Sequence, residues 1–429
     1  MPQRGAAGAG GAPTPLRQIA GLFLRLGVSA FGGPAAHIAL MQREVVERRG
    51  WLSREQFLDY LGATNLIPGP NSTELAIHIG HARGGARGLV VAGACFILPA
   101  ALMVTGLAWA YARFGSLPAV RGPLHGMQAV VIAVVAQALW RLLRSAVRNP
   151  WHAALSAGAL AATWLGLHEL LVLAGCGALA ALGVRRGAGS GPPPAAPPRE
   201  PRAGVAGGAG SAEVRPDAAG PPRAGRLARL AAGLPGAAAA GPAWAGAALT
   251  VPAAAAPFGL GPLFLVFVKI GAVLFGSGYV LLAFLRADLV QRLHWLTERQ
   301  LLDAIAVGQF TPGPVFTTAT FVGYLLGGAR GAAVATAGIF LPAFLFVAVS
   351  GPLVPRMRRS RLAGAVLDGV NVGSLALMAF VTLILARVAV ADPAGAALAL
   401  ASLLALVVFR LNPAWLIAAG AAVGAAVWR

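Results

Sequence analysis

Long apolar runs alternate with short polar stretches along almost the whole chain. Many runs are roughly 20 residues long, which is the length that crosses a bilayer as a helix. Examples are Leu89–Ala110, Met127–Leu143, Leu263–Leu285, Ala332–Val349 and Gly364–Leu385. This pattern predicts an all-α polytopic membrane protein that lies in a lipid bilayer.

The composition agrees with this class. Of the 429 residues, 57% are hydrophobic and 11% are charged, whereas soluble domains carry about 25% charged residues. The net charge of +20 is almost all arginine, which we assign to membrane orientation and not to nucleic acid. The only lysine, Lys269, precedes Ile270, which excludes a Walker A loop. Cys95 and Cys176 lie in apolar segments, so we expect no disulfide, no metal and no cofactor.

Two copies of one unit follow each other along the chain. Trp51–Pro70 and Trp295–Pro314 are identical at eight of 20 positions, and both end in Pro-Gly-Pro. The same offset aligns FLRLGVSAFGG (23–33) with FVKIGAVLFGS (267–277). The sequence therefore predicts two homologous repeats joined by a linker.

The domain boundaries follow from this alignment and from composition. We expect a disordered tail at 1–16, a first repeat at 17–184, a disordered Pro/Gly/Arg-rich cytoplasmic linker at 185–240, a connecting span at 241–260 and a second repeat at 261–429. Arginines concentrate after the helix that begins near LHGMQ in the first repeat, but before the matched LDGVN helix in the second. Equivalent loops then face opposite sides of the membrane, so the repeats are inverted. If the halves are inverted, the chain must cross the membrane one additional time between them. This gives about 13 spans in total.

Each Pro-Gly-Pro interrupts an apolar helix. Proline breaks a helix, and lipid tolerates a break only against protein or a water-filled cavity. The residues of the two breaks are Pro68, Gly69, Pro70, Pro312, Gly313 and Pro314. A discontinuous span and a re-entrant hairpin both fit the pattern. The helix after each break starts with unpaired N–H groups at a positive dipole end, which predicts a central anion site at the repeat interface.

Polar and small residues near the breaks complete the candidate substrate site. The polar ones are Asn65, Asn71, Ser72 and Thr73 in the first repeat, and Gln309, Thr317 and Thr318 in the second. The glycines that interrupt the preceding helix are Gly32, Gly33 and Gly276. Two turns earlier, the matched cations Arg25 and Lys269 lie in apolar sequence, where a charge is costly and indicates function. Snorkelling to the interface is the alternative for these two cations.

Three titratable residues are candidates for coupling transport to protons. Glu74 lies in the first turn after the first break, where it would oppose an anion unless it were protonated. His125 and Asp368 occupy matched positions in the two repeats and serve either a proton relay or helix packing. Asp59 and Asp303 are also matched, and either cap and pair locally or take part in transport.

The motifs together resemble the chromate ion transporter family in its long, two-domain form. The resemblance lies in FGGPAAH (31–37), FGSGY (275–279), WLTERQLLDAIAVGQFTPGP (295–314), ATFVGYLLGG (319–328) and LDGVN (367–371), and it covers both halves. It implies antiparallel halves that export chromate across the bacterial cytoplasmic membrane and confer chromate resistance. In the first half, Asn65 stands where the family often has glutamine.

Other functions stay open at this point. Sulfate is a tetrahedral dianion like chromate, so a sulfate transporter fits the same pattern, as does a passive anion channel. A membrane enzyme acting on lipid phosphate would need a clustered acid, base or nucleophile, but Ser72 and Glu74 are not repeated in the other half. We therefore expect a transporter without catalytic residues. A homodimer is a further open alternative.

Overall fold

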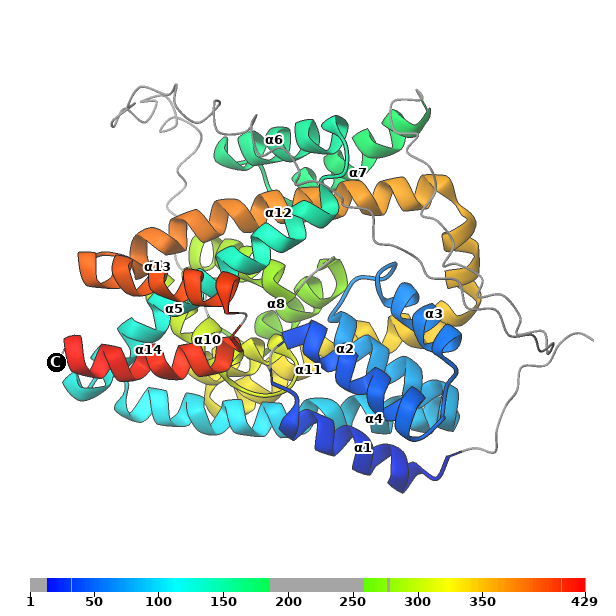
Figure 1. Cartoon of the computed structure of the whole chain (residues 1–429), viewed down its shortest axis with the longest axis horizontal. Coiled ribbons are helices and arrows are strands. Elements are labelled where there is room, and N and C mark those ends of the chain that lie inside the picture. Colours follow the sequence, from blue (N-terminus) through cyan, green and yellow to red (C-terminus); the bar gives the residue numbers. More distant parts are fainter. Residues whose placement is uncertain (1–13, 32, 186–257, 276–277, 410, 429) are drawn as a thin grey trace, which may run out of the picture. The chain divides into compact units, whose positions relative to one another are not determined.

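The computed structural model describes residues 14–31, 33–185, 258–275, 278–409 and 411–428 (Figure 1). All regular structure in these ranges is helical, which confirms the predicted all-α class. Most of the expected tail, the linker and the connecting span lie outside the described residues.

The helices of the first half are α1 (Leu16–Ser29), α2 (Gly33–Gln42), the π-helix η1 (Arg43–Arg48), α3 (Arg54–Thr64), α4 (Asn71–Phe114), α5 (Pro118–Ala146), α6 (Pro150–Trp164) and α7 (Glu169–Arg185). Those of the second half are α8 (Leu260–Val273), the 3₁₀-helix η2 (Gly278–Val280), α9 (Leu281–Leu285), the π-helix η3 (Arg286–Arg292), α10 (Glu298–Phe310), the 3₁₀-helix η4 (Val315–Thr317), α11 (Thr318–Arg359), α12 (Arg361–Ala389), α13 (Pro393–Val408) and α14 (Pro413–Val427).

Within the described part of the chain, four helices are long and apolar enough to cross a membrane. They are Asn71–Phe114, Pro118–Ala146, Val315–Ser350 and Arg361–Ala389. The helices α7, α8, α13 and α14 are shorter and also apolar. The protein is thus an α-helical membrane protein, while the number of about 13 spans stays a prediction.

The helix that leads into each Pro-Gly-Pro starts with the same cap. At the start of α3, the Gln56 backbone N–H donates to Ser53 Oγ (3.1 Å), and the Ser53 N–H donates to Gln56 Oε1 (3.0 Å). Thr297 and Gln300 repeat this reciprocal capping box at the start of α10. The box satisfies N–H groups that have no partner in the helix and so fixes the same starting point in both repeats.

The helix that follows each Pro-Gly-Pro turns back on itself at a glycine pair. Residues 84–85 of α4 leave helical geometry, with a φ of +58° at the second glycine. Across this turn Gly80 and Gly88 lie so close that a Cβ on either would collide with the carbonyl of the other. The long helix α4 therefore consists of a short arm (71–83) and a long arm (86–114). The matched glycines of α11 repeat this geometry.

The helix α3 and the short arm of α4 form a helical hairpin whose tip is the first Pro-Gly-Pro. At its base, the Arg83 guanidinium donates to the Trp51 carbonyl (3.4 Å) just before α3. Midway, Tyr60 stacks on His78, with 5.6 Å between ring centroids. These pairs join residues at similar distances before and after the tip, so the chain reverses direction there.

The second half contains the same hairpin, built from α10 and the short arm of α11. Phe258 packs edge-on against Trp295 just before α10 (5.4 Å between centroids), and it also lies beside Gly327 at the end of the arm. Near the tip, Gly308 and Thr318 face each other so closely that a Cβ on Gly308 would collide with the hydroxyl. The chain therefore reverses direction and forms a helical hairpin at the Pro-Gly-Pro of each repeat.

The two halves interlock through α5 and α12. The helices α13 and α14 pack on α5, while α6 and α7 pack on α12 (Figure 1). Small residues allow the close approach: Gly126 of α5 meets the Gly420 backbone of α14, and Gly369 of α12 meets the Cys176 backbone of α7. Close packing over small residues holds helices together in lipid. Each half thus supplies the helix pair that covers the other half's long helix.

Candidate functional site

The tips of the two hairpins line one cavity of about 310 Å³. Residues 70–72 contribute from the first tip and residues 314–316 from the second. Pro34 at the start of α2 and Gly278 of η2 contribute from the irregular segments, and Arg141 of α5 is the cation among the lining residues. The structure therefore brings both predicted helix breaks to a single place.

Reciprocal hydrogen bonds hold the tips against the opposite repeat. The Gly69 N–H donates to the Leu274 carbonyl at the end of α8 (2.8 Å), and the Gly313 N–H donates to the Ala30 carbonyl at the end of α1 (3.0 Å). Gly69 and Gly313 are matched positions, as are Ala30 and Leu274. A contact in which each copy presents the same two groups to the other is the mark of a two-fold relation. The tips are consequently part of the interface between the repeats.

Both tip glycines adopt a backbone that other residues rarely take. Gly69 has a φ of +139° and Gly313 a φ of +92°, in the region that glycine enters without a steric penalty. A Cβ would also collide, at Gly69 with the Glu74 carboxylate and at Gly313 with Ala100. The glycine in each Pro-Gly-Pro is therefore required both by conformation and by space.

Most residues that line the cavity are apolar, and the polar ones are Asn71, Ser72, Arg141 and Tyr279. After Pro70, α4 begins at Asn71 without a side-chain cap, and the first N–H groups of a helix have no intrahelical acceptor. Thr317 and Thr318 use their hydroxyls to donate to the carbonyls of Pro314 (2.8 Å) and Val315 (2.9 Å). The second tip thus satisfies its own turn, and the Arg141 guanidinium is a donor of the kind that suits an oxyanion.

The two side-chain amides predicted to lie beside the breaks, Asn65 and Gln309, have different surroundings. Asn71 donates from Nδ2 to Asn65 Oδ1 (2.9 Å) and thereby closes the first tip. Gln309, at the matched position of Asn65, is buried, and its Nε2 has no partner among the described residues. Thr73 is also fully buried, and in the same part of the chain its Oγ1 has no partner. None of Asn65, Thr73 and Gln309 lines the cavity.

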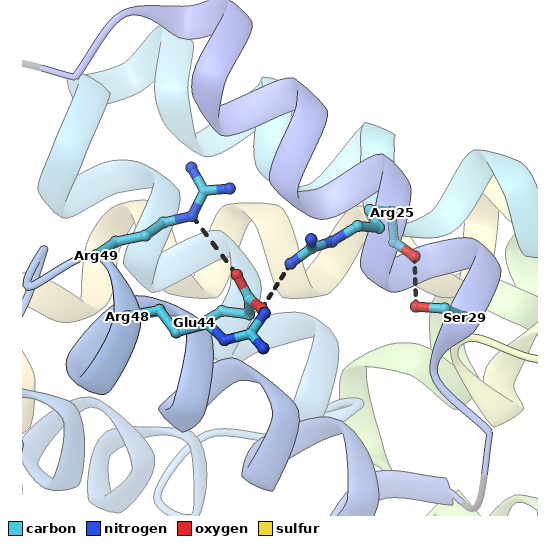
Figure 2. Close-up of polar contacts among 5 residues, drawn as sticks. All are labelled: Arg25, Ser29, Glu44, Arg48 and Arg49. Atoms are coloured by element: carbon cyan, nitrogen blue, oxygen red, sulfur yellow. Dashed lines mark hydrogen bonds and ion pairs between the residues drawn. The ribbon is translucent and has the colours of Figure 1, made fainter.

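Arg25 is held by an acidic residue outside the cavity. Figure 2 shows three arginines around the Glu44 carboxylate of η1. Arg25 Nη2 lies 2.6 Å and Arg48 Nη1 2.8 Å from Oε1, and Arg49 Nε lies 3.6 Å from Oε2. Burial by itself would raise the pKa of Glu44, but Arg25 and Arg48 outweigh it, so this pKa lies below its ordinary value.

The second repeat contains a matched ion-pair cluster. Lys269 Nζ lies 2.6 Å from the Asp288 carboxylate of η3, and Arg292 Nη2 lies 2.8 Å from it. Lys269, Asp288 and Arg292 align with Arg25, Glu44 and Arg48. Both predicted intramembrane cations thus tie the first helix of a repeat to its π-helix, and neither lines the cavity. The sequence prediction missed their acidic partners because the two π-helices read as interfacial connectors.

The three candidates for proton coupling lie in different surroundings. Glu74 is fully buried, and its carboxylate lies against Gly69 with no hydrogen-bond partner among the described residues. His125 Nε2 lies 2.9 Å from Asp392 Oδ2, at the start of α13. Asp368 is exposed on α12. Only Glu74 is therefore close to a hairpin tip.

The glycines that interrupt the first helix of each repeat are only partly described. Gly33 has a φ of +77° and starts α2, next to Pro34 in the cavity wall. Gly32 and Gly276 lie outside the described residues.

The sequence reasoning missed one residue of the site, Arg141, and the partners of another, Asp303. Arg141 was counted only among the arginines that set orientation, and no motif distinguishes it from them. Asp303, matched with exposed Asp59, is buried and accepts hydrogen bonds from Gln128 (2.7 Å) and Tyr111 (2.8 Å). This network anchors the second hairpin to α5 and α4, which only the fold brings together.

The fold and the cavity define a helical membrane protein whose two broken-helix hairpins line one cavity. Comparison with known proteins gives the family. The model of the chromate transporter family matches residues 17–181 and again residues 261–425. The chain belongs to the chromate transporter family, as its motifs indicated, and it is a transporter and not an enzyme. The alternative of a lipid-phosphate enzyme is thereby discarded.

Individual relatives match over nearly their whole length. The chain is 32% identical to a chromate transport protein of Cupriavidus metallidurans, over 96% of this chain and 93% of that protein. It is 30% identical to a probable chromate transport protein of Synechococcus elongatus, over 88% of this chain and 86% of that protein. It is also 30% identical to a chromate transport protein of Pseudomonas aeruginosa, over 88% and 82%. No solved structure matches the chain.

Proposed function

We propose that this protein exports chromate from the bacterial cytoplasm across the cytoplasmic membrane and thereby confers chromate resistance. The convergence of both Pro-Gly-Pro tips and Arg141 on one cavity is the observation that carries the proposal. A helix start and a guanidinium are the donors that suit a tetrahedral oxyanion. Relatives along nearly the whole chain are chromate transport proteins, which favours chromate as that anion.

The membrane potential supports the outward direction. Each elementary charge that crosses 100 mV is worth about 2.3 kcal/mol, so a dianion that leaves a negative cytoplasm gains roughly 4.6 kcal/mol. Export therefore needs no ATP, whereas import would need coupled cations. In this proposal the hairpins enter the bilayer from opposite sides as re-entrant elements, and the inverted repeats exchange access to the shared cavity.

The tip glycines provide a direct test. Cells that express the wild-type chain should tolerate more chromate and accumulate less of it than cells without it. Gly69→Leu and Gly313→Leu should remove most of this effect, because a side chain at either tip meets Glu74 or Ala100 and disfavours the backbone. Gly106→Leu is the matched control, since a Cβ there meets nothing within 4 Å.

Two outcomes would contradict the proposal. Equal chromate accumulation in all strains would exclude chromate transport, and flux of labelled chromate that runs only into the cytoplasm would exclude export. Sulfate is the second candidate substrate, because it has the same charge and shape. Excess sulfate that abolishes chromate flux, together with faster sulfate flux in vesicles, would assign the cavity to sulfate.

A further inference from the structure

A buried histidine joins the tips of the two hairpins. His37 of α2 has 1% of its surface exposed. Its Nε2 lies 3.0 Å from the Ala30 carbonyl, and its Nδ1 lies 3.3 Å from Ser72 Oγ. The same Ala30 carbonyl accepts the N–H of Gly313 at the second tip. His37 therefore bridges Ser72, which lines the cavity, to the group that positions the opposite tip.

The Ala30 carbonyl determines which ring nitrogen of His37 carries a hydrogen. A carbonyl only accepts, so Nε2 carries the proton in this contact, and in the neutral ring Nδ1 has a lone pair. The Ser72 hydroxyl must then donate to Nδ1, which turns its hydrogen away from the cavity. In the protonated ring, Nδ1 donates to Ser72 Oγ instead. The hydroxyl hydrogen of Ser72 becomes free to donate to an anion in the cavity.

We propose that His37 takes up a proton when the oxyanion enters the cavity, so that anion and proton bind together. The inference rests on the proposed function and specifies the protonation of the site when the anion is bound. Without an anion, burial disfavours the charged imidazolium. A dianion near Ser72 offsets that cost and also gains the freed hydroxyl donor. Because the linkage is reciprocal, the proton must strengthen anion binding by the same factor.

The elements that contact α2 are α1, η1 and α4, and their buried acidic and histidine side chains are Glu44, Glu74 and His78. Arg141 and Tyr279 line the cavity itself. Arg25 and Glu44 are paired with each other, and the Glu74 carboxylate lies against Gly69. Among the described residues, His37 makes no ion pair. The matched position in the second repeat is Leu281, so this coupling is built into the first repeat alone.

The test counts protons during chromate binding. Binding to the purified protein is measured by calorimetry in buffers of different ionisation enthalpy, at mildly alkaline pH, where chromate itself stays a dianion. The wild type should take up protons, and its affinity should fall by up to about tenfold per pH unit. In His37→Gln, which is neutral at every pH, binding should be weaker and independent of pH, with no proton uptake.

Two further variants test the role of the Ser72 hydroxyl and the specificity of the effect for His37. Ser72→Ala retains His37 but removes the hydroxyl that transmits its protonation, so it should weaken the pH dependence. His78→Gln is the control, because His78 is a second buried histidine of the first repeat and stacks on Tyr60. It should keep the proton uptake of the wild type.

The outcomes separate this inference from the function on which it rests. A wild type that binds no chromate would overturn both. Chromate binding without proton uptake, or uptake that persists in His37→Gln, would overturn the role of His37 alone. Uptake that persists in His37→Gln and is lost in Glu74→Gln would assign the proton to the buried carboxylate.

Discussion

At the scale of the residue, Arg141 differs from the other arginines by its position. It is the cation among the residues that line the cavity, next to the starts of two helices. The aligned position in the second repeat is Ile384, so the cavity has one guanidinium from one half. In the proposed function, this guanidinium and the start of α4 bind the dianion.

Replacement of Arg141 should weaken anion binding directly. Arg141→Gln should raise the dissociation constant for chromate by about tenfold or more, because hydrogen bonds to a charged partner contribute about 1.5–3 kcal/mol. Arg141→Lys should keep part of the affinity, since lysine retains the charge but not the planar fork. Calorimetry on the purified variants measures this, with Arg144→Gln on the same helix as the control. Equal affinities for both glutamine variants would exclude Arg141 from the site.

The ion-pair cluster of Glu44 should contribute stability that depends on pH. The pKa of Glu44 is lowered in the folded protein, so its contribution is present above the unfolded-state pKa and lost as the pH falls through the lower folded-state value. Glu44→Gln should therefore lower the free energy of unfolding by about 1 kcal/mol at neutral pH. In acid the difference from the wild type should disappear.

Thermal unfolding in detergent across this pH range checks the expectation. Exposed Glu47 on the same π-helix supplies the control, because Glu47→Gln leaves the Glu44 cluster intact. A Glu44 variant that is as stable as the wild type at neutral pH would show that the ion pairs of Glu44 do not contribute to the free energy of unfolding.

At the scale of the element, the hairpin is the unit that each repeat contributes to the cavity. Its two helices lie side by side because the chain reverses at Pro-Gly-Pro. The glycine pair at the end of the short arm then reverses the chain a second time. The apolar pattern located both breaks but could not give the direction of the chain after them. The contacts of Arg83 with Trp51 and of Tyr60 with His78 decided that point.

A larger side chain at the contact between Gly80 and Gly88 should destabilise the packing of the two arms of α4. Gly80→Val should lower the free energy of unfolding by about 1–3 kcal/mol, the usual cost of overpacking, because Gly80 lies directly on Gly88. Gly158→Val on α6 is the control, since a Cβ there meets nothing within 4 Å. Thermal unfolding of both variants compares them. An unchanged Gly80 variant would show that the two arms of α4 are not tightly packed.

At the scale of the whole molecule, the two repeats depend on each other. Each tip is bonded to the first helix of the other repeat, and each long helix α5 or α12 is covered by helices of the other half. Neither repeat can therefore complete its half of the cavity alone. We expect the isolated first repeat to bind no chromate.

The proposed opposite orientation of the repeats predicts a simple labelling pattern. Ser116, between α4 and α5, and Ser360, between α11 and α12, lie in equivalent exposed loops. In a background without Cys95 and Cys176, Ser116→Cys and Ser360→Cys should react with an impermeant thiol reagent from opposite sides of intact cells. Labelling of both from the same side would contradict the inverted repeats.

The sequence by itself determined the membrane class, the duplication, the family and the positions of the two helix breaks. These follow from hydropathy and from local rules: apolar length selects helices in lipid, and proline and positive-φ glycine end them. Only the tertiary structure decided that both tips meet in one cavity, that Arg25 and Lys269 are paired outside it, and that Arg141 and His37 stand beside it. These outcomes depend on contacts between residues that are far apart in the sequence, and no local pattern in the chain predicts such contacts.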